Sequence, residues 1–351
     1  MRNLITTALA GGLLATVACG STLAADLAPL NSDNEPDRMD WSELESRFGE
    51  IPAVPADTSV GGVSKTLTNE YWRSLGEGYQ NVADSLGIEF VYQAAQSEGD
   101  QLGQLSIAET LITQGFSAML VSPQTDANLQ PAVEKAAELG IPVLNVNDAV
   151  IPSAANYVGN VQKDNGMRAA KWFIENKPEG GKVAVIEGQP GVFAAGQRTA
   201  GFTETITGDS DKFDVVASVP ADWSRELAFN NASTILQQHP DLVGFYANND
   251  GMALGVVEAV KAAGLQDQVA VIGTDGISDA YASIRAGDLT GTIDSFPVLT
   301  GEVAMEVVLR LLGGQELPRV VATPQALITI DNIEAYSTQD MAELRKVLLS
   351  Q

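Results

Sequence analysis

The amino-acid sequence predicts an α/β protein built from two doubly wound parallel β-sheets. From residue 58 onwards, short runs rich in β-forming residues alternate with helical patterns, which is typical of parallel α/β architecture. Several runs are continuously apolar, as expected for strands buried on both faces of a sheet. About ten such strands are too many for one doubly wound sheet of ordinary size. The chain therefore suits two sheets of about five strands each.

The expected strands are short and evenly spread along the chain. They cover residues 59–65, 89–92, 118–122, 142–147, 182–188, 214–219, 242–248, 269–275, 290–295 and 326–330. A shorter strand at 156–158 precedes the expected seam between the two halves, near Gly159 and Asn160.

Helical patterns fill the segments between these strands. They cover residues 70–86, 101–114, 127–139, 165–175, 194–207, 225–238, 251–263 and 299–312. Four of the patterns end at a glycine, which is the residue that most readily adopts the left-handed conformation of a helix C-cap. A last amphipathic helix is expected within residues 337–351.

The N-terminus has the pattern of an export signal. One positive charge, Arg2, precedes an apolar stretch over residues 4–17 that is too short to span a membrane. Small residues follow, and they favour cleavage near Ala24 in a signal peptide of residues 1–24. The alternative is a lipoprotein signal with the lipid on Cys19. Either interpretation places the protein outside the cytoplasm, in the periplasm.

Residues 25–57, which we call the leader, differ from the rest of the chain. Residues 26–57 hold nine acidic residues and two arginines, a composition that predicts mostly irregular structure. Asp40 and Glu43 have the spacing of a capping box, and an apolar face follows it, which predicts one short helix. This helix either packs on the main body or docks a partner protein.

Composition excludes several classes of function. Forty-five acidic residues against 20 basic ones give a formal charge of −25, which disfavours nucleic acid and anionic lipid as partners. One cysteine excludes an internal disulfide framework, and one histidine argues against His-rich metal sites and His-based triads. We expect no metal and no cofactor.

Candidate functional residues follow the predicted strands. Ligands of open α/β sheets bind at the carboxyl ends of the strands, where this chain places amides, carboxylates and one arginine. These residues are Asn147, Asp148, Arg198, Asn248, Asn249, Asp250, Asp275 and Ser295. Simpler interpretations exist for some of them: a helix cap for Asn249 or Asp250, a turn for Asp275, and a surface ion pair for Arg198.

Several motifs resemble one family over residues 57–336. The segments LTNEYW at 67–72, AGQRTAGF at 195–202, PADW at 220–223, ANNDGMALG at 247–255 and GTDG at 273–276 are similar to periplasmic sugar-binding proteins of bacterial ABC transporters, the ribose-binding type. The resemblance implies the type I periplasmic binding fold, with two lobes joined by a hinge. It implies one lobe of residues 58–160 plus 296–324 and another of 161–295 plus 325–336.

The resemblance also implies the roles of several site residues. Asn69 matches an asparagine that binds ligand hydroxyls, and Asn249 matches a second amide. Tyr71 and Trp72 match aromatics on one side of the sugar, and Trp223 matches the aromatic that faces them. Arg198 and Asp275 match a ligand-binding arginine and a carboxylate that accepts hydroxyl protons.

Four positions, at three places in the chain, depart from the ribose-binding pattern. Asn147 and Asp148 replace an Asp-Arg pair, Ser295 replaces a glutamine, and Lys65 replaces a serine. With Lys65 and Arg198 facing Asp148 and Asp275, the site is expected to be near neutral. We therefore expect a neutral sugar or a sugar alcohol as ligand, and tighter binding of a sugar alcohol or a non-ribose monosaccharide than of ribose.

The expected function is capture of this ligand and its delivery to the permease subunits of an ABC transporter, without a chemical reaction. A monomer is expected. One alternative is a sensory or chemotaxis receptor for a sugar. The other is a hydrolase of sugars or nucleosides, for which Asp148 and Asp275 are the candidate carboxylate pair.

Overall fold

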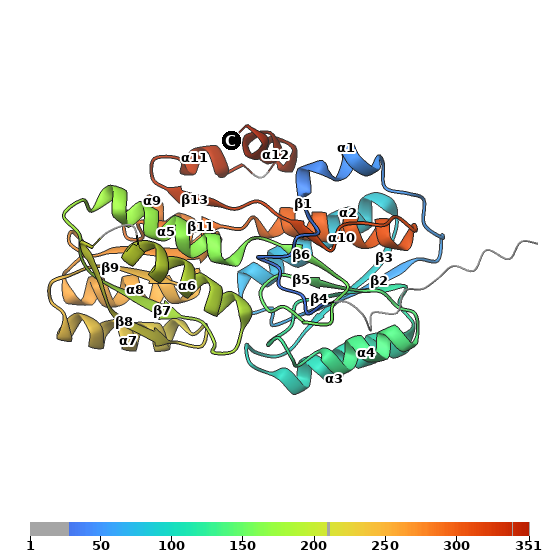
Figure 1. The fold of residues 1–351 in the computed structure, drawn as a ribbon, viewed down its shortest axis with the longest axis horizontal. Coiled ribbons are helices and arrows are strands. Elements are labelled where there is room, and N and C mark those ends of the chain that lie inside the picture. The colour runs from blue at the N-terminus through green and yellow to red at the C-terminus, as the bar shows by residue number, and fades with distance from the viewer. Residues whose placement is uncertain (1–27, 209–210, 339, 351) are drawn as a thin grey trace, which may run out of the picture.

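The computed structural model describes residues 28–208, 211–338 and 340–350. The predicted signal peptide, including Cys19, lies outside the described residues. Within them the chain forms two parallel α/β lobes that lie side by side along the long axis of the molecule (Figure 1). No helix in the described part of the chain is long and apolar enough to cross a bilayer.

The first lobe is built on a seven-stranded sheet whose strands are all parallel. Their order is β1-β12-β6-β5-β4-β2-β3. The strands are β1 (Arg38–Asp40), β2 (Ser59–Ser64), β3 (Glu89–Ala94), β4 (Ala118–Val121), β5 (Val143–Val146), β6 (Asn156–Gly159) and β12 (Val320–Ala322). Side chains are buried on both faces of this sheet, with Val60 and Leu120 in one apolar cluster and Val63 and Val121 in another.

The second lobe is built on a six-stranded sheet in the order β13-β11-β10-β9-β7-β8. Its strands are β7 (Gly181–Glu187), β8 (Phe213–Pro220), β9 (Leu242–Ala247), β10 (Ala270–Asp275), β11 (Gly291–Asp294) and β13 (Ala326–Thr329). The last strand pairs antiparallel with β11, and the other pairs are parallel.

Helices cover both faces of each sheet (Figure 1). In the first lobe they are α2 (Glu70–Leu86), α3 (Gln101–Gln114), α4 (Gln130–Glu138) and α10 (Pro297–Leu312). In the second lobe they are α5 (Gln162–Asn176), α6 (Phe193–Gly208), α7 (Arg225–Gln238), α8 (Asp250–Ala263), α9 (Ser278–Arg285) and α11 (Ile333–Tyr336). The leader adds the 3-10 turn η2 (Trp41–Glu43) and α1 (Leu44–Phe48), and the chain ends with α12 (Met341–Leu349).

Short segments carry the chain between the two sheets. They join β6 to α5, β11 to α10, and β12 to β13. We retain as a proposal the division into residues 58–160 plus 296–324 and residues 161–295 plus 325–336, because its three internal boundaries fall within these segments.

The predicted fold class is confirmed, but the strand count is wrong. The sheets have seven and six strands, because β1 and β12 were not expected. Both have only three residues, too few for a periodic pattern, and β1 carries two charged side chains. Their extended conformation comes from pairing with each other and with β6, which the local sequence does not encode. The helices α9 and α11 were also missed.

The leader is more ordered than its composition predicts. The capping box of Asp40 and Glu43 is confirmed. Trp41 and Leu44 are buried in the main apolar cluster, so the short helix packs on the body of the protein. The guanidinium of Arg345, from α12, lies 5.2 Å from the Trp41 ring centroid, so the two ends of the described chain meet here.

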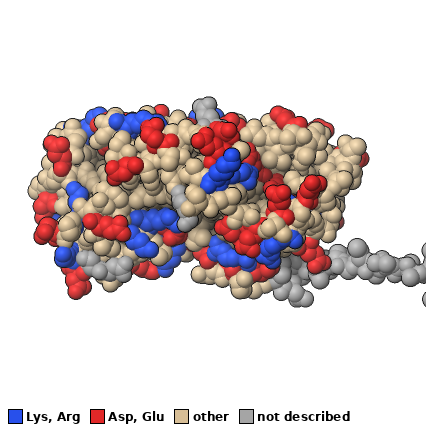
Figure 2. Space-filling model, turned by 90° about the horizontal axis from the view of Figure 1, so that it is seen from above, with Lys and Arg blue, Asp and Glu red and all other residues tan. Residues whose placement is uncertain are grey.

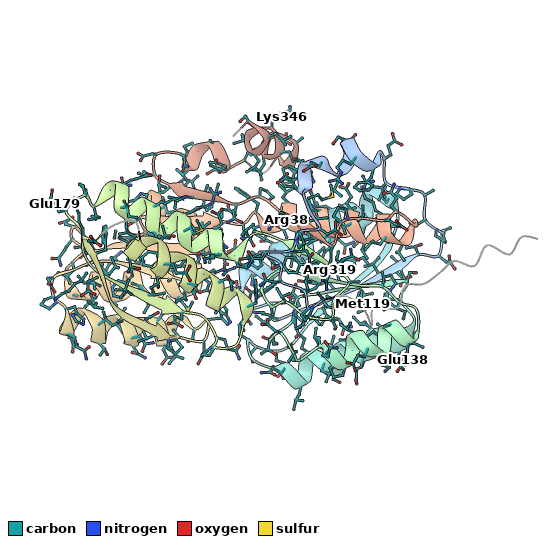
Figure 3. All side chains as sticks on the ribbon, in the orientation of Figure 1. Arg38, Met119, Glu138, Glu179, Arg319 and Lys346 are labelled. Carbon is teal, nitrogen blue, oxygen red and sulfur yellow. The ribbon has the colours of Figure 1, made fainter. Side chains whose placement is uncertain are left out.

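Charge is dispersed over the face of the molecule that Figure 2 shows. Figure 2 shows acidic and basic side chains mixed across one face of the molecule. Acidic side chains such as Glu138 and Glu179 are exposed at the periphery of the two lobes, whereas Met119 lies inside the first lobe (Figure 3). On the face that Figure 2 shows, the acidic side chains are therefore mixed with basic ones.

We expect Trp41→Ala to lower the free energy of unfolding by about 3–5 kcal/mol, because a large side chain that is only 7% exposed leaves a cavity. Urea unfolding followed by circular dichroism measures this loss. Leu102→Ala is the control, because Leu102 is 82% exposed and its loss should cost little. Equal unfolding midpoints for the two variants would show that the leader is not part of the folded core.

Candidate functional site

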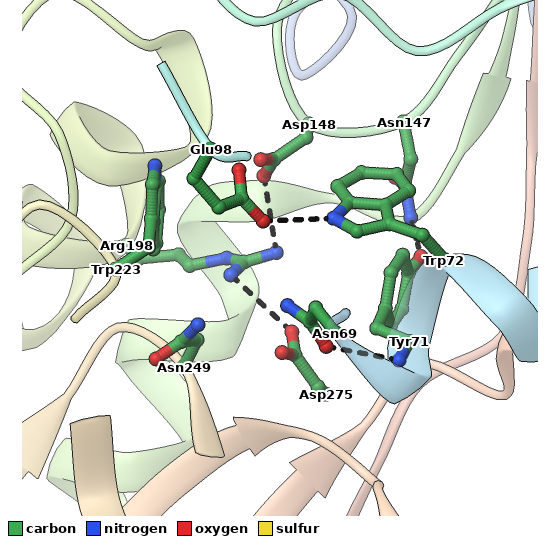
Figure 4. Close-up of a pocket in the computed structure, with 10 residues that line it drawn as sticks. All are labelled: Asn69, Tyr71, Trp72, Glu98, Asn147, Asp148, Arg198, Trp223, Asn249 and Asp275. Carbon is green, nitrogen blue, oxygen red and sulfur yellow. Dashed lines mark hydrogen bonds and ion pairs between the residues drawn. The ribbon is translucent and has the colours of Figure 1, made fainter. Parts of the chain in front are cut away.

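A cavity lies between the lobes, at the carboxyl ends of the parallel strands (Figure 4). Its free volume is about 10 Å³, roughly the space of one water molecule, so the lobes are closed against each other around it. The residues that line it are Asn69, Tyr71, Trp72, Glu98, Asn147, Asp148, Arg198, Trp223, Asn249 and Asp275. Nine of these ten were predicted from the sequence, and Glu98 was not.

The remaining two predicted site residues lie beside the cavity. The ammonium group of Lys65 bonds the carboxylate of Asp148. Ser295 is fully buried, and its backbone N–H donates to the carbonyl of Asp275 at 3.3 Å. The Ser295 hydroxyl has no hydrogen-bond partner among the described residues and does not line the cavity. Direct contact between Ser295 and a ligand stays a prediction.

Left-handed backbone conformations gather at this site. Asn147 and Asp148 follow β5 with φ of 45° and 57°, Asp222 and Trp223 follow β8 with φ of 50° and 64°, and Asp275 ends β10 with φ of 136°. Such conformations cost about 1–3 kcal/mol each in side-chain-bearing residues and are common at binding sites. Here they occur where the chain leaves a strand. Four of these five residues line the cavity, and the fifth, Asp222, directly precedes Trp223.

The position of Trp223 depends on a glycine. A Cβ atom at Gly188, which directly follows β7, would lie 2.1 Å from the Trp223 indole. Only glycine lets the ring lie against the backbone at this place. Opposite it, Trp72 packs edge-on against Tyr71 with ring centroids 4.8 Å apart, and its indole N–H donates to Glu98 at 3.0 Å.

Lys65 occupies the space between the two indoles. Its ammonium group lies 5.5 Å from the Trp72 ring centroid and 5.4 Å from that of Trp223. An ammonium group over an indole face is attracted by the ring quadrupole. Because Trp72 belongs to the first lobe and Trp223 to the second, Lys65 links the two lobes.

Arg198 is the second link between the lobes. Its guanidinium lies 3.6 Å from a carboxylate oxygen of Asp148, in the first lobe, and 3.6 Å from one of Asp275, in the second. It also donates to Gln162 at 2.8 Å and to the carbonyl of Asn248 at 2.7 Å. Arg198 is 3% exposed, so the interpretation as a surface ion pair is wrong.

The carboxyl groups of the cavity differ in their electrostatics. Burial opposes ionisation of Asp148, but Lys65 and Arg198 outweigh it and hold its pKa below the usual range. Burial raises the pKa of Asp275 well above its usual value in spite of Arg198, and burial also raises the pKa of Glu98. The sequence led us to expect two cations and two carboxylates in the site. Glu98 adds a third carboxyl group, which that expectation did not include.

One of the simpler interpretations, the helix cap at Asn249, holds together with a place in the cavity. The Asn249 side chain accepts from the backbone N–H of Met252 at 2.8 Å and so caps α8, while it also lines the cavity. The Asn69 side chain likewise accepts from Tyr71 N–H at 3.0 Å and caps α2. Asp275 is more than a turn residue, because its carboxylate pairs with Arg198.

Asp250 supports the loop that follows Asp275. One carboxylate oxygen accepts from the backbone N–H groups of Gly276 and Ile277, at 2.8 and 3.1 Å, and the other accepts from Thr292 at 2.7 Å. Burial raises the pKa of Asp250 to about 6. Asp250 thus lies behind the cavity wall and does not line it.

Glu98 was missed because its neighbours, Ser97 and Gly99, are typical of an exposed turn. It follows β3 by four residues, and this place near the carboxyl end of a strand is the signal that could have identified it. One oxygen of its carboxyl group accepts from Trp72, and the other is buried without a partner among the described residues.

This geometry agrees with what known proteins show. Residues 60–316 match the family model described as periplasmic binding protein domain. The chain belongs to this family. The resemblance in its sequence motifs is thereby confirmed.

Curated relatives cover most of the chain. It is 34% identical to the D-allose-binding periplasmic protein of Escherichia coli, over 70% of this chain and 82% of the relative. It is 32% identical to a ribose import binding protein of Bacillus subtilis, over 77% and 87%. It is 28% identical to a xylitol-binding protein of Mycolicibacterium smegmatis, over 84% of each chain.

Solved structures confirm the type I periplasmic binding fold. An ABC transporter solute-binding protein of Actinobacillus succinogenes with bound D-allose has a TM-score of 0.76 and 31% identity, covering 80% of this chain and all of the other. One of Mycobacterium smegmatis with bound glycerol has a TM-score of 0.75 and 28% identity, covering 81% and 98%. The comparisons support neither the sensory receptor nor the hydrolase.

We expect Gly188→Ala to displace the Trp223 indole, because the added methyl group overlaps the ring. Overpacking of this kind costs about 1–3 kcal/mol, and displacement of the ring should shift tryptophan fluorescence to the red. Gly196→Ala is the matched control, because a Cβ there meets nothing within 4 Å. Identical emission spectra and stabilities for both variants would contradict this account of the cavity wall.

Proposed function

We propose that the chain captures a neutral monosaccharide or a sugar alcohol between its lobes and delivers it to the permease subunits of an ABC transporter. The observation that carries this proposal is the convergence of Trp72 and Asp148 from one lobe with Trp223, Arg198 and Asp275 from the other. Membership of the periplasmic binding protein family supports it, and so do relatives named for allose, ribose and xylitol.

The residue types suit a polyhydroxy ligand. Indole faces pack against the apolar C–H surface of a sugar or of an extended polyol chain. Asp148, Asp275 and Glu98 accept hydroxyl protons, while Lys65 and Arg198 donate to hydroxyl or ring oxygens. Hydrogen bonds to charged groups contribute about 1.5–3 kcal/mol each. A few of them supply the roughly 8 kcal/mol of a micromolar complex.

Binding requires the lobes to open. The closed cavity has room for about one water molecule, and the Lys65 ammonium lies between the indoles. A ligand therefore enters an open form, displaces the ammonium group from the rings, and then contacts both lobes when they close. Because the ligand contacts both lobes only in the closed form, its binding shifts the equilibrium toward closure.

We further propose that the protein is exported to the periplasm as a monomer. The predicted signal peptide of residues 1–24 is removed near Ala24, with lipid attachment at Cys19 as the alternative. No reaction is catalysed, because the proposed role of the site is to hold its ligand and release it unchanged.

The function is tested by calorimetry with D-allose, ribose, arabinose, xylitol and glycerol, together with small-angle scattering at saturating ligand. We expect a sugar alcohol or a non-ribose monosaccharide to bind more tightly than ribose, because Asp148 accepts where the ribose pattern has an arginine donor. The bound protein should be more compact than the free one. Ribose as the tightest ligand would overturn the proposed specificity, and no binding by any of the five would overturn the function.

We expect Asp148→Asn to weaken binding of the tightest of these ligands by about 1–3 kcal/mol, because a charge-assisted bond is lost and Lys65 loses its partner. Calorimetry measures the change. Asp241→Asn is the control, since Asp241 forms an exposed ion pair with Lys182 outside the cavity. Unchanged affinity in Asp148→Asn would remove Asp148 from the site.

A further inference from the structure

Gln162 connects the cavity residues of the two lobes without lining the cavity itself. It is fully buried and is the first residue of α5, directly after the chain passes from one lobe to the other. Its side-chain N–H group donates to Asn147 at 3.1 Å and to Asn160 at 2.8 Å. Its side-chain oxygen accepts from Arg198 Nε at 2.8 Å. One amide thus orients a cavity residue of each lobe.

The first turn of α5 is held by a residue from far along the chain. The N-cap position is Val161, whose apolar side chain offers no hydrogen bond to the free N–H groups of the helix. The leader residue Asp33 supplies them instead. Its two carboxylate oxygens accept from the backbone N–H of Gln162 at 3.0 Å and of Lys163 at 2.7 Å. A carboxylate at this end of a helix also interacts favourably with the helix dipole.

The segment that carries Asp33 is anchored on the first lobe. Leu30 is buried in an apolar cluster of that lobe, and its N–H donates to the carbonyl of Pro152 at 2.8 Å. Arg319, near the centre of the molecule in Figure 3, donates to the carbonyl of Ala28 at 2.7 Å and to Glu35 at 3.1 Å. The leader therefore carries a first-lobe carboxylate to the first helix of the second lobe. Asp33 itself lies outside residues 60–316, which the family model matches, whereas Gln162 and Lys163 lie within them.

We infer that Asp33 is a positioning residue for ligand capture. Asp33 fixes the first turn of α5 and thereby holds the Gln162 amide between Asn147 and Arg198. Asp33 forms no hydrogen bond to either of these cavity residues. The expected effect of Asp33 on ligand affinity rests on the proposed function. Without Asp33, the N–H groups of the helix end lose their partners, the Gln162 side chain gains freedom, and Arg198 loses a fixed acceptor.

A double-mutant cycle separates this role from a general effect on stability. The variants are Asp33→Ala, Gln162→Ala, their combination and the control Asp40→Ala, in which a leader carboxylate that caps only the leader's own helix is lost. We expect affinity for the tightest ligand to fall about fivefold in Asp33→Ala and about tenfold in Gln162→Ala, each roughly the effect of one or two lost hydrogen bonds. The double variant should match Gln162→Ala within about twofold. Additive losses, or an equal loss in Asp40→Ala, would overturn the inference.

A second measurement needs no ligand. In protein labelled with nitrogen-15 at arginine, the Arg198 Nε–H signal is assigned by its disappearance in Arg198→Lys. We expect its exchange with solvent to be about tenfold faster in Asp33→Ala than in the unmodified protein, and unchanged in Asp40→Ala. If Asp33→Ala does not fold, Asp33→Asn replaces it, with a smaller acceleration expected because one acceptor oxygen remains. Unchanged exchange would overturn the inference, whereas absence of sugar binding by the unmodified protein overturns the proposed function alone.

Discussion

The closed arrangement depends on one buried charge, the guanidinium of Arg198. An arginine that is almost fully removed from water is stable only when its charge is balanced and its N–H groups are bonded. Asp275 in its own lobe supplies one carboxylate, and Asp148 in the other lobe supplies the second. The lobes must therefore approach for Arg198 to be fully paired, and hydroxyl groups of a ligand can complete the same pairing.

The sequence predicted those parts of the fold that repeat. The periodicity of residues 70–86, 101–114 and 225–238 places three helices with the bounds that the structure shows. The strands β1 and β12 could not be predicted, because their conformation arises from pairing between segments about 280 residues apart. Neither pattern nor composition encodes such a distant pairing.

The candidate site was likewise predicted only in part from the sequence. Residues at strand ends, such as Asn147 and Asp275, follow from the rule that ligands bind where parallel strands end, and the motifs around Trp72 and Trp223 follow from the resemblance. Glu98 lies in a segment that resembles an exposed turn. Two partners of Gln162, Asn147 and Arg198, lie on distant segments, one in each lobe, so these bonds become visible only once the lobes are assembled.

The left-handed backbone at Asn147 and Asp148 limits how the specificity of this protein can change. Asparagine, aspartate and glycine tolerate positive φ best, so few other side chains fit these two positions without added strain. Lys65 and Glu98 carry no such restriction, because neither has a positive φ. Redesign of the pocket for a new sugar should therefore begin at Lys65 and Glu98, where the choice of residue is not limited to those that tolerate positive φ.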